Sequence, residues 1–326
     1  MHHRQLLSDR HSFVIPNRFL KAALGTAIGA GLVVAPAVAA APKARVIVVP
    51  GSADFLAVDG SSVWATNRGR VERWSTAGKL AEVAMTRPCG AMAIAFDSLW
   101  VADCEDRTLS RIDLGTDRIV HVIPTGIANP EGELNVVAGA GSIWIANDDK
   151  GLIARIDPVT NTVVATIAVD PSTYYLAFGH RSLWAVSAVH RSLQKIDPVT
   201  NRVIARTALG REPGFLVAGE GAVWVQEQGD GTLARIDPET GTVSGRVKVD
   251  GTLQYGDIDA GGGKIWLRTT LGQTFVVIDA RTLAIKARVG AVTGSGALRY
   301  TPQGIWTTSH DVHMLSWWQY PRQIGE

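Results

Sequence analysis

"GSIWIANDDKGLIARIDPVTNTV" occupies residues 141–163, and "RSLWAVSAVHRSLQKIDPVTNRV" occupies residues 181–203, forty positions later. Both stretches place a Trp thirteen residues before an Asp that follows Ile and precedes Pro. A spacing kept this strictly indicates an internal repeat, and repeat periods of about 20–50 residues are typical of solenoids and propellers. The repeat, rather than any single motif, therefore decides the fold.

The repeat runs through most of the 326 residues, because tryptophans occur at positions 64, 100, 144, 184, 224, 266 and 306. Aspartates of an Ile-Asp pair follow five of them by thirteen residues, at positions 113, 157, 197, 237 and 279. Each unit contains short apolar runs separated by turn residues, such as "FLVAGEGAVW", "LIARID" and "TVVATIAV", and these patterns predict strands. Seven all-strand units predict an all-β protein, a seven-bladed β-propeller with four-stranded blades.

The recurring Trp and Asp both have structural explanations. A Trp in a central strand fills the wedge between adjacent sheets with a large apolar area. In Asp157-Pro-Val-Thr-Asn161 the Asp suits the first position of a tight turn, Pro presets φ at the second, and Asn accepts a positive φ at the end. A catalytic acid would not be needed at five equivalent outer turns, so we interpret these aspartates as turn residues.

The two ends of the repeat region complement each other. The last unit, from "GALRYTPQGIW" to "HMLSWWQY", supplies three strands and then stops. Residues 45–49 resemble an outer strand and are expected to add the fourth strand to the last blade, with Trp317 and Trp318 packing the seam. Such a closure removes the open edge of the ring.

The first 39 residues differ from the rest of the chain. Four basic residues (Arg4, Arg10, Arg18 and Lys21) precede the uncharged run "AALGTAIGAGLVVAPAVAAA" at 22–41. This pattern predicts a secretory signal peptide over residues 1–39, with an uncleaved membrane anchor as the alternative, followed by one propeller domain over 40–326. We expect a periplasmic or secreted protein without a stable membrane span after cleavage.

The net charge of the chain bears on the kind of partner that it binds. Removing residues 1–39 takes away four basic residues and Asp9, so the net charge of +2 becomes −1. No basic patch remains for a phosphate backbone, so nucleic-acid binding is not expected, and we expect a monomer.

Cys89 and Cys104 flank a hairpin centred on Phe96-Asp97, which places them opposite each other within a residue and predicts a disulfide in an oxidising compartment.

The stretch "IWIANDDKGLIARIDPVTNTVVATI" resembles the YVTN-type propeller repeat of secreted and surface-layer proteins, and the wider pattern is similar to the virginiamycin B (streptogramin) lyase family. That resemblance covers about residues 45–320 and implies a seven-bladed fold. It also implies an elimination reaction that uses Mg²⁺ with His and Glu side chains near the central channel. The family places His or Tyr eleven residues before the Trp and Glu three residues after it. Here no His occupies the first position, and only Glu227 keeps the Glu, so the catalytic pattern does not carry over.

These two sets of positions were expected to face the channel mouth together. Eleven residues before the tryptophans lie Ala53, Cys89, Glu133, Thr173, Pro213, Tyr255 and Ser295; three residues after them lie Asn67, Asp103, Asn147, Ser187, Glu227, Thr269 and Ser309. Polar side chains from or near these sets are the candidate ligand-binding residues, and they are Glu133, Asn147, Asp148, Glu227, Tyr255, Asp257, Arg268 and His310. Glu227 is the candidate catalytic residue. The segment 123–134, "IPTGIANPEGEL", is a longer loop expected on the mouth side.

Glu133 and Asp148 are the candidate metal ligands, and their oxygen donors suit Ca²⁺ or Mg²⁺. Two functions remain open from the sequence. The first is an exported propeller that binds a small molecule or a protein at the channel mouth without catalysis. The alternative is a metal-dependent lyase or lactone hydrolase with its site at the same mouth.

Overall fold

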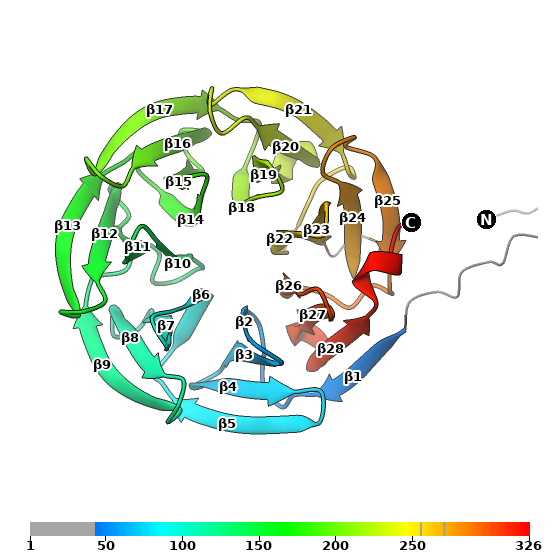
Figure 1. The fold of residues 1–326 in the computed structure, drawn as a ribbon, viewed down its shortest axis with the longest axis horizontal. Helices are drawn as coiled ribbons and strands as arrows, with labels where there is room; N and C mark the ends of the chain where they lie inside the picture. The colour runs from blue at the N-terminus through cyan, green and yellow to red at the C-terminus, as the bar shows by residue number, and fades with distance from the viewer. Residues whose placement is uncertain (1–42, 255, 270–271) are drawn as a thin grey trace, which may run out of the picture. The chain divides into compact units, whose positions relative to one another are not determined.

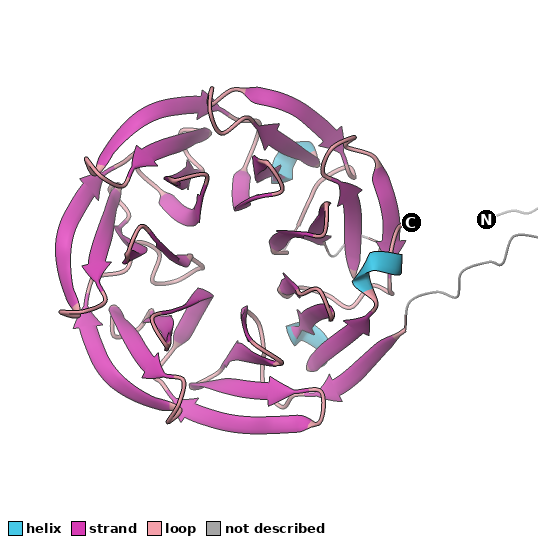
Figure 2. Cartoon of the chain, viewed as in Figure 1, coloured by secondary structure: helices cyan, strands magenta, loops and turns pink. Residues whose placement is uncertain are grey.

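The computed structural model describes residues 43–254, 256–269 and 272–326. In these residues the chain forms seven antiparallel sheets of four strands, arranged as the blades of a ring (Figures 1 and 2). The fold is therefore the all-β seven-bladed propeller that the repeat predicts. The proposed signal segment, residues 1–39, lies outside the described residues.

Blades 1 to 6 follow one another along the chain, each from its innermost to its outermost strand. Blade 1 contains β2 (Leu56–Asp59), β3 (Ser62–Asn67), β4 (Arg70–Ser75) and β5 (Gly78–Ala84), and blade 2 contains β6 (Pro88–Ala95), β7 (Ser98–Asp103), β8 (Thr108–Asp113) and β9 (Arg118–Pro124). Blade 3 contains β10 (Val136–Gly139), β11 (Ser142–Asp148), β12 (Leu152–Asp157) and β13 (Thr162–Ala168), and blade 4 contains β14 (Thr173–Gly179), β15 (Ser182–Ser187), β16 (Ser192–Asp197) and β17 (Arg202–Ala208). Blade 5 contains β18 (Pro213–Gly219), β19 (Ala222–Glu227), β20 (Thr232–Ile236) and β21 (Val243–Lys248), and blade 6 contains β22 (Ile258–Gly261), β23 (Lys264–Arg268), β24 (Phe275–Asp279) and β25 (Ile285–Val289).

Blade 7 combines the two ends of the described chain. Its strands are β26 (Leu298–Tyr300), β27 (Gly304–Ser309) and β28 (Met314–Gln319), and β1 (Ala44–Val48) pairs antiparallel with β28 as the outermost strand. Figure 1 shows β1 running beside β28 at the rim of the ring. Three short 3₁₀ turns complete the elements: η1 (Gln228–Asp230), η2 (His310–Val312) and η3 (Pro321–Gln323). Within the described ranges no helix is long and apolar enough to cross a membrane.

The repeated tryptophans form the core between blades. All seven are at most 1% exposed. In five blades the indole N–H also donates to the carbonyl oxygen five residues earlier, at 3.0–3.1 Å; these donors are Trp100, Trp144, Trp184, Trp224 and Trp266. All seven thus fill the wedge between sheets, and these five also close the first hairpin of their own blade.

In five blades a basic side chain on the third strand joins the indole to the next blade. In blade 3 the guanidinium of Arg155 lies 4.8 Å from the ring centroid of Trp144 and its Nε donates to Ser142 Oγ at 2.8 Å. Its Nη1 donates to the carbonyl oxygen of Pro198 at 2.7 Å and to Asn201 Oδ1 at 3.0 Å, both in the outer turn of blade 4. The equivalent basic residues in other blades are Arg73, Arg111, Lys195 and Arg235. The Trp and the turn recur together because they are two sides of one contact between blades.

The turn aspartates have the role predicted for them. Asp157 Oδ1 accepts the N–H of Val159 at 2.7 Å, and the N–H of Asn161 donates to the Asp157 carbonyl at 2.8 Å. Asn161 has φ of 56°, in the left-handed region. In blade 4 the backbone N–H of Val199 and the hydroxyl of Thr200 hold the pKa of the corresponding Asp197 below its ordinary value. These carboxylates shape turns on the outside of the ring.

Candidate functional site

The positions three residues after the tryptophans hold the connections between blades. Asn67 Oδ1 accepts the N–H of Ser52 at 2.7 Å, Asp103 accepts the N–H of Thr86 at 2.9 Å, and the hydroxyl of Ser187 donates to a backbone carbonyl at 2.6 Å. In each case the partner belongs to the segment that leads from the outer strand of one blade to the inner strand of the next. These side chains therefore hold the backbone of the connections between blades.

Glu227 belongs to the same set. Its carboxylate receives Nε and Nη2 of Arg246, both at 2.9 Å, the hydroxyl of Thr232 at 2.6 Å and the N–H of Gly210 at 2.7 Å. Burial alone would raise the pKa of Glu227, but the hydrogen bonds from Arg246, Thr232 and Gly210 outweigh it and hold this pKa below its ordinary value. An ionised carboxylate with four donors around it has little capacity to accept a proton from a substrate.

Other predicted residues have separate local partners and do not form one site. Asp148 Oδ1 accepts the N–H of Lys150 at 2.8 Å within a turn, with Asn147 beside it in sequence, and His310 Nδ1 lies 3.0 Å from the carboxylate of Asp311. Tyr255 lies outside the described residues. Among the residues that the structure describes, no group of three or more His, Cys, Asp or Glu side chains is placed to hold a metal ion.

Arg268 is fully buried and ties blade 6 to blade 7. Its guanidinium donates to the carbonyl oxygens of Thr274 and Gly294, both at 2.7 Å, and to Ser309 Oγ at 3.1 Å. Burial lowers the pKa of Arg268 to about 10, with Asp54 acting in the opposite direction. The residue therefore carries a positive charge beneath the mouth, and much of its hydrogen-bonding capacity is used by backbone.

The structure instead brings together side chains at the starts of the inner strands. The rings of Tyr175 and Phe215 have centroids 4.4 Å apart, and those of Phe55 and Phe215 are 6.1 Å apart. Phe55 precedes blade 1 and Phe215 lies in blade 5, and these blades are not neighbours in a ring of seven. The aromatic contact therefore crosses the central channel, and Glu133 lines the same cavity as Tyr175 and Phe215.

Two cavities open beside this aromatic cluster. The larger, about 410 Å³, is lined by Glu133, Tyr175 and Phe215 together with Asn129, Gly132, Glu212, Gln228, Leu253 and Gln254. The smaller, about 170 Å³, includes Asp54, Phe55 and Arg87. Glu133 lines both cavities, so they form one site, here called the mouth site.

Two carboxyl groups, Asp54 and Glu133, line the smaller cavity together with Arg68 and Arg87. Burial raises the pKa of Asp54 to about 7, and repulsion from Asp257 adds to the effect, while Arg268 opposes it. Burial likewise raises the pKa of Glu133 to about 7, helped by Asp54 and Asp257 and opposed by the hydroxyl of Tyr175. Burial and the nearby Glu133 also raise the pKa of Tyr175. The mouth site thus contains two carboxyl groups whose pKa values are raised to about 7.

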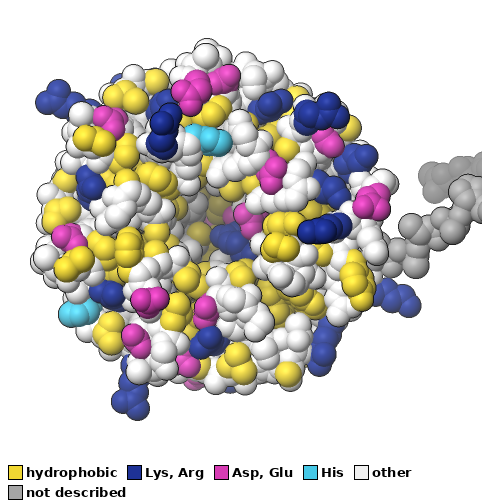
Figure 3. Space-filling view, in the orientation of Figure 1, with side chains coloured by type: hydrophobic (Ala, Val, Ile, Leu, Met, Phe, Trp, Pro, Cys, Tyr) yellow, Lys and Arg dark blue, Asp and Glu magenta, His cyan; other side chains and the backbone are white. Residues whose placement is uncertain are grey.

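Asp257 faces a different partner inside the channel. It forms an ion pair with Arg299, next to Asp259, and all three line a channel cavity of about 300 Å³ whose other walls are mainly aliphatic. Figure 3 shows a central hollow in which basic and acidic side chains lie together. Burial raises the pKa of Asp259, and Arg299 counters this. The predicted residue Asp257 therefore links the mouth to the channel.

The disulfide supports the loop that carries Glu133. Cys89 and Cys104 are bonded, with Cα atoms 5.9 Å apart, as predicted. The pairing within the hairpin differs from the prediction, because Cys89 lies opposite Ala102 and not Cys104. An irregularity between Cys89 and Ala93 inserts two residues into β6, and the disulfide runs diagonally past the pair Pro88–Asp103, next to this bulge.

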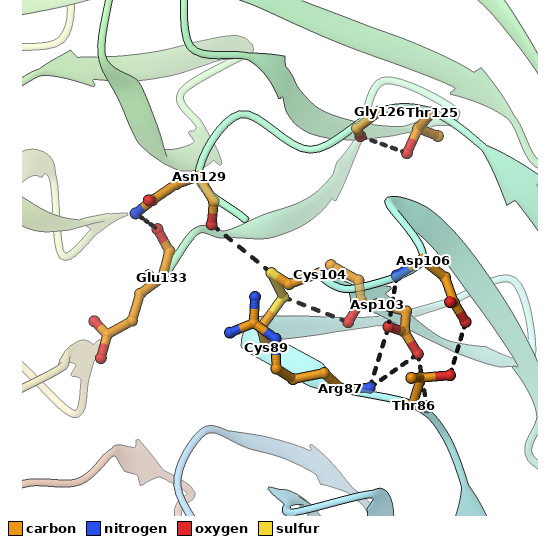
Figure 4. Close-up of a disulfide and its surroundings, with 11 residues drawn as sticks. Thr86, Arg87, Cys89, Asp103, Cys104, Asp106, Thr125, Gly126, Asn129 and Glu133 are labelled. Atoms are coloured by element: carbon orange, nitrogen blue, oxygen red, sulfur yellow. Dashed lines mark hydrogen bonds between the residues drawn. A yellow bond between two sulfur atoms is a disulfide. The ribbon is translucent and has the colours of Figure 1, made fainter. Parts of the chain in front are cut away.

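Figure 4 shows Asn129 beside the disulfide and the side chain of Glu133 extending away from it. Asn129 Nδ2 donates to the carbonyl oxygen of Glu133 at 3.0 Å, and the next residue, Leu134, accepts the N–H of Ala91 at 2.9 Å. The long loop 123–134 thus bends over blade 2 and delivers Glu133 to the mouth site.

Sequence reasoning identified Glu133 and Asp257 but missed Asp54, Tyr175 and Phe215. A signal was present, since the position nine residues before the Trp holds Phe55, Tyr175 and Phe215, while the other four units hold Ala91, Asn135, Asp257 and Ala297. Three of the seven units thus place a large ring at a position that faces the channel axis.

Comparison with known proteins supports the fold. Virginiamycin B lyase from Staphylococcus aureus is 16% identical over 85% of this chain and 99% of its own, with a TM-score of 0.74. A streptogramin B lyase is 14% identical over 84% of this chain and 97% of its own (TM-score 0.70), and BamB from Moraxella catarrhalis is 18% identical over 83% and 85% (TM-score 0.61). No family model and no curated protein matches the chain. At these identities the likeness concerns the fold alone, that of a streptogramin-lyase-like seven-bladed propeller.

Proposed function

We propose that the chain is an exported, non-catalytic propeller that binds a positively charged ligand at the mouth site. One observation carries the proposal: Glu133 lines one cavity with Asp54 and Phe55 and the adjoining cavity with Tyr175 and Phe215. A cation relieves the repulsion between two carboxylates, and an organic ammonium group also gains from contact with aromatic faces. A rigid ring of sheets with the site at its axis suits binding without rearrangement.

Export is supported by two independent features. The basic and then apolar composition of residues 1–39 is typical of a secretory signal. The disulfide between Cys89 and Cys104 suits an oxidising compartment such as the periplasm.

Binding without catalysis is favoured by the state of Glu227. It alone matches the Glu of the lyase pattern, and its carboxylate is bonded to Arg246, Thr232 and Gly210. One solved structure that resembles this chain is a catalytically inactive virginiamycin B lyase with quinupristin, at 15% identity and a TM-score of 0.72. Incubating this chain with quinupristin and following the mass of the compound therefore provides a direct control, and we expect no conversion with or without Mg²⁺.

The binding test uses benzylamine as the cation and benzyl alcohol as its neutral analogue, titrated calorimetrically at pH 8. We expect saturable binding of benzylamine alone, weakened at least tenfold by Glu133→Gln and by Asp54→Asn, and weakened in the native chain as the pH falls below 6. Glu131→Gln is the matched control, because Glu131 is exposed in the same loop. Equal binding of both compounds, or binding unaffected by both substitutions, would refute the proposal.

A further inference from the structure

The seam between blades 7 and 1 departs from the contact that joins blades 1 to 5 to their following blades. Eleven residues after Trp306 lies Trp317, where three other blades have Arg at the same distance from their Trp and a fourth has Lys. Two residues before Trp306 lies Gly304, where four blades have Ser. Both members of the Arg–Ser pair that normally covers the indole have been replaced.

The two replacements fit each other. Trp306 and Trp317 lie opposite each other in the β27–β28 ladder, with ring centroids 4.7 Å apart. The ring of Trp317 lies against Gly304, and a Cβ atom at that position would collide with it. Gly304 is therefore the residue that lets the second indole approach the strand.

Trp306 makes no hydrogen bond through Nε1 within the described part of the chain, and in this it resembles Trp64, whereas the indoles of the other five blades donate to the carbonyl oxygen five residues earlier. The carbonyl oxygen five residues before Trp306 belongs to Thr301, and it accepts the N–H of Gly304 at 3.2 Å within the turn. The Nε1 of Trp64 is buried, whereas Trp306 lines a cavity. The N–H of Trp306 is therefore available to a ligand or to water in that cavity.

The cavity has about 520 Å³, within the range of about 300–1,000 Å³ typical of small-molecule sites. Its lining consists of two indoles and small neutral groups: Gly60, Ser61, Thr76, Thr301, Gln303, Trp306 and Trp317. None of these side chains is charged. The residues come from blade 1 and blade 7, so this seam pocket lies between the two ends of the propeller.

We propose that the seam pocket binds a neutral saccharide ring. The C–H face of a sugar packs on an indole, and its hydroxyl groups match the hydroxyls of Ser61 and Thr76, the amide of Gln303 and the free indole N–H. A basic side chain from a partner protein is the other occupant that the repeat suggests, because basic groups cover the equivalent indoles. No carboxylate lines the pocket to stabilise such a charge, and this favours the sugar. The site is separate from the mouth site and does not depend on the proposed function.

The experiment titrates the full chain with maltotriose, cellotriose and N,N′-diacetylchitobiose, followed by tryptophan fluorescence and calorimetry. N-acetylarginine amide serves as the cationic probe. We expect saturable binding of at least one saccharide and none of the arginine derivative. Trp317→Arg combined with Gly304→Ser restores the pair found in other blades, and it should abolish binding while preserving the thermal transition. Tyr320→Ala is the control, because Tyr320 is exposed and does not line the pocket.

Gln303→Ala provides a second, milder variant at the exposed rim, so the test does not depend on folding of the double variant. We expect it to weaken saccharide binding about three- to tenfold, the loss of one hydrogen bond. The proposal is overturned if no saccharide binds at millimolar concentration, if the arginine derivative binds instead, or if binding is unchanged in both Trp317→Arg/Gly304→Ser and Gln303→Ala.

Discussion

Replacing Asp54 by Asn should stabilise the protein at pH 8 and have much less effect at pH 5. Burial and the neighbouring carboxylate of Asp257 raise the pKa of Asp54 from 3.8 to about 7. Between these values the folded protein retains a proton that the unfolded chain has released. The free energy of unfolding therefore falls as the pH rises through this window, and above pH 7 the full cost of an ionised Asp54 is present.

The size of the effect follows from the pKa shift. Between pH 5 and pH 7 the window spans two pH units, and one unit corresponds to about 1.4 kcal/mol, so the upper limit is about 3 kcal/mol. Asp54 is partly exposed, and its repulsion is shared with Glu133, which titrates in the same range. We therefore expect Asp54→Asn to gain about 1–2 kcal/mol at pH 8 relative to pH 5.

The assay is chemical denaturation of the native chain and of the variant at pH 5, 6, 7 and 8. Asp97→Asn is the matched control, because Asp97 is exposed in a hairpin turn whose positive φ Asn also accepts. The gain from Asp54→Asn should grow from pH 5 to pH 7 and level off above pH 7, whereas the effect of Asp97→Asn should stay constant. A gain that is the same at all four pH values, or a loss of stability at pH 8, would refute the electrostatic reasoning and place Asp54 in a structural role.

Three further predictions concern the ring itself. Arg155→Met should lower the free energy of unfolding by about 1–2 kcal/mol, because it removes the contacts with Trp144 and with the turn of blade 4. Arg202 is exposed, so Arg202→Met should change the stability little. Equal effects of the two substitutions would contradict the role of Arg155 between blades. Cys89→Ala with Cys104→Ala should lower stability by about 2–3 kcal/mol, measured against the native chain with and without reductant, and an unchanged midpoint would contradict it. Deleting residues 45–49 should lower the melting temperature sharply, because β28 would lose its outer partner; unchanged melting followed by circular dichroism would exclude a stabilising closure.

The fold was predictable because the repeated residues are those that pack. A Trp at a fixed distance from an Asp-Pro turn shows the period of the blade, and the period gives the strand count. The role of the Arg between the Trp and the Asp, such as Arg155, was not predictable, because its partners lie in the next blade. Arg155 contacts Pro198 and Asn201, more than forty positions away. The sequence of a single repeat unit therefore does not show the contact between its Arg and the outer turn of the next blade.

The site was only partly predictable, for two physical reasons. Side chains such as Glu227 and Asp103 were assigned to the mouth from their place in the unit, but their direction depends on which backbone N–H groups lie within reach. The bulge in β6 shifts the register opposite Cys89 by two residues, and such an insertion is set by local packing and not by alternation. Glu133 was identified because it is a polar side chain eleven residues before Trp144, in the set expected to face the channel mouth.

Departure from the repeat is therefore not sufficient evidence of function. Asn67, Asp103 and Glu227 differ in type at one repeat position, yet all three bind the backbone of the preceding connection and so do the same structural work. Trp317 and Gly304 also depart from the repeat, but there the basic side chain that joins the indole to the next blade is missing and a cavity lined by Trp306 and Trp317 lies at the seam. A functional position in such a propeller is one where the residue changes and the hydrogen bond or contact of the repeat is not replaced. By this criterion the seam pocket and the mouth site stand out from the rest of the ring.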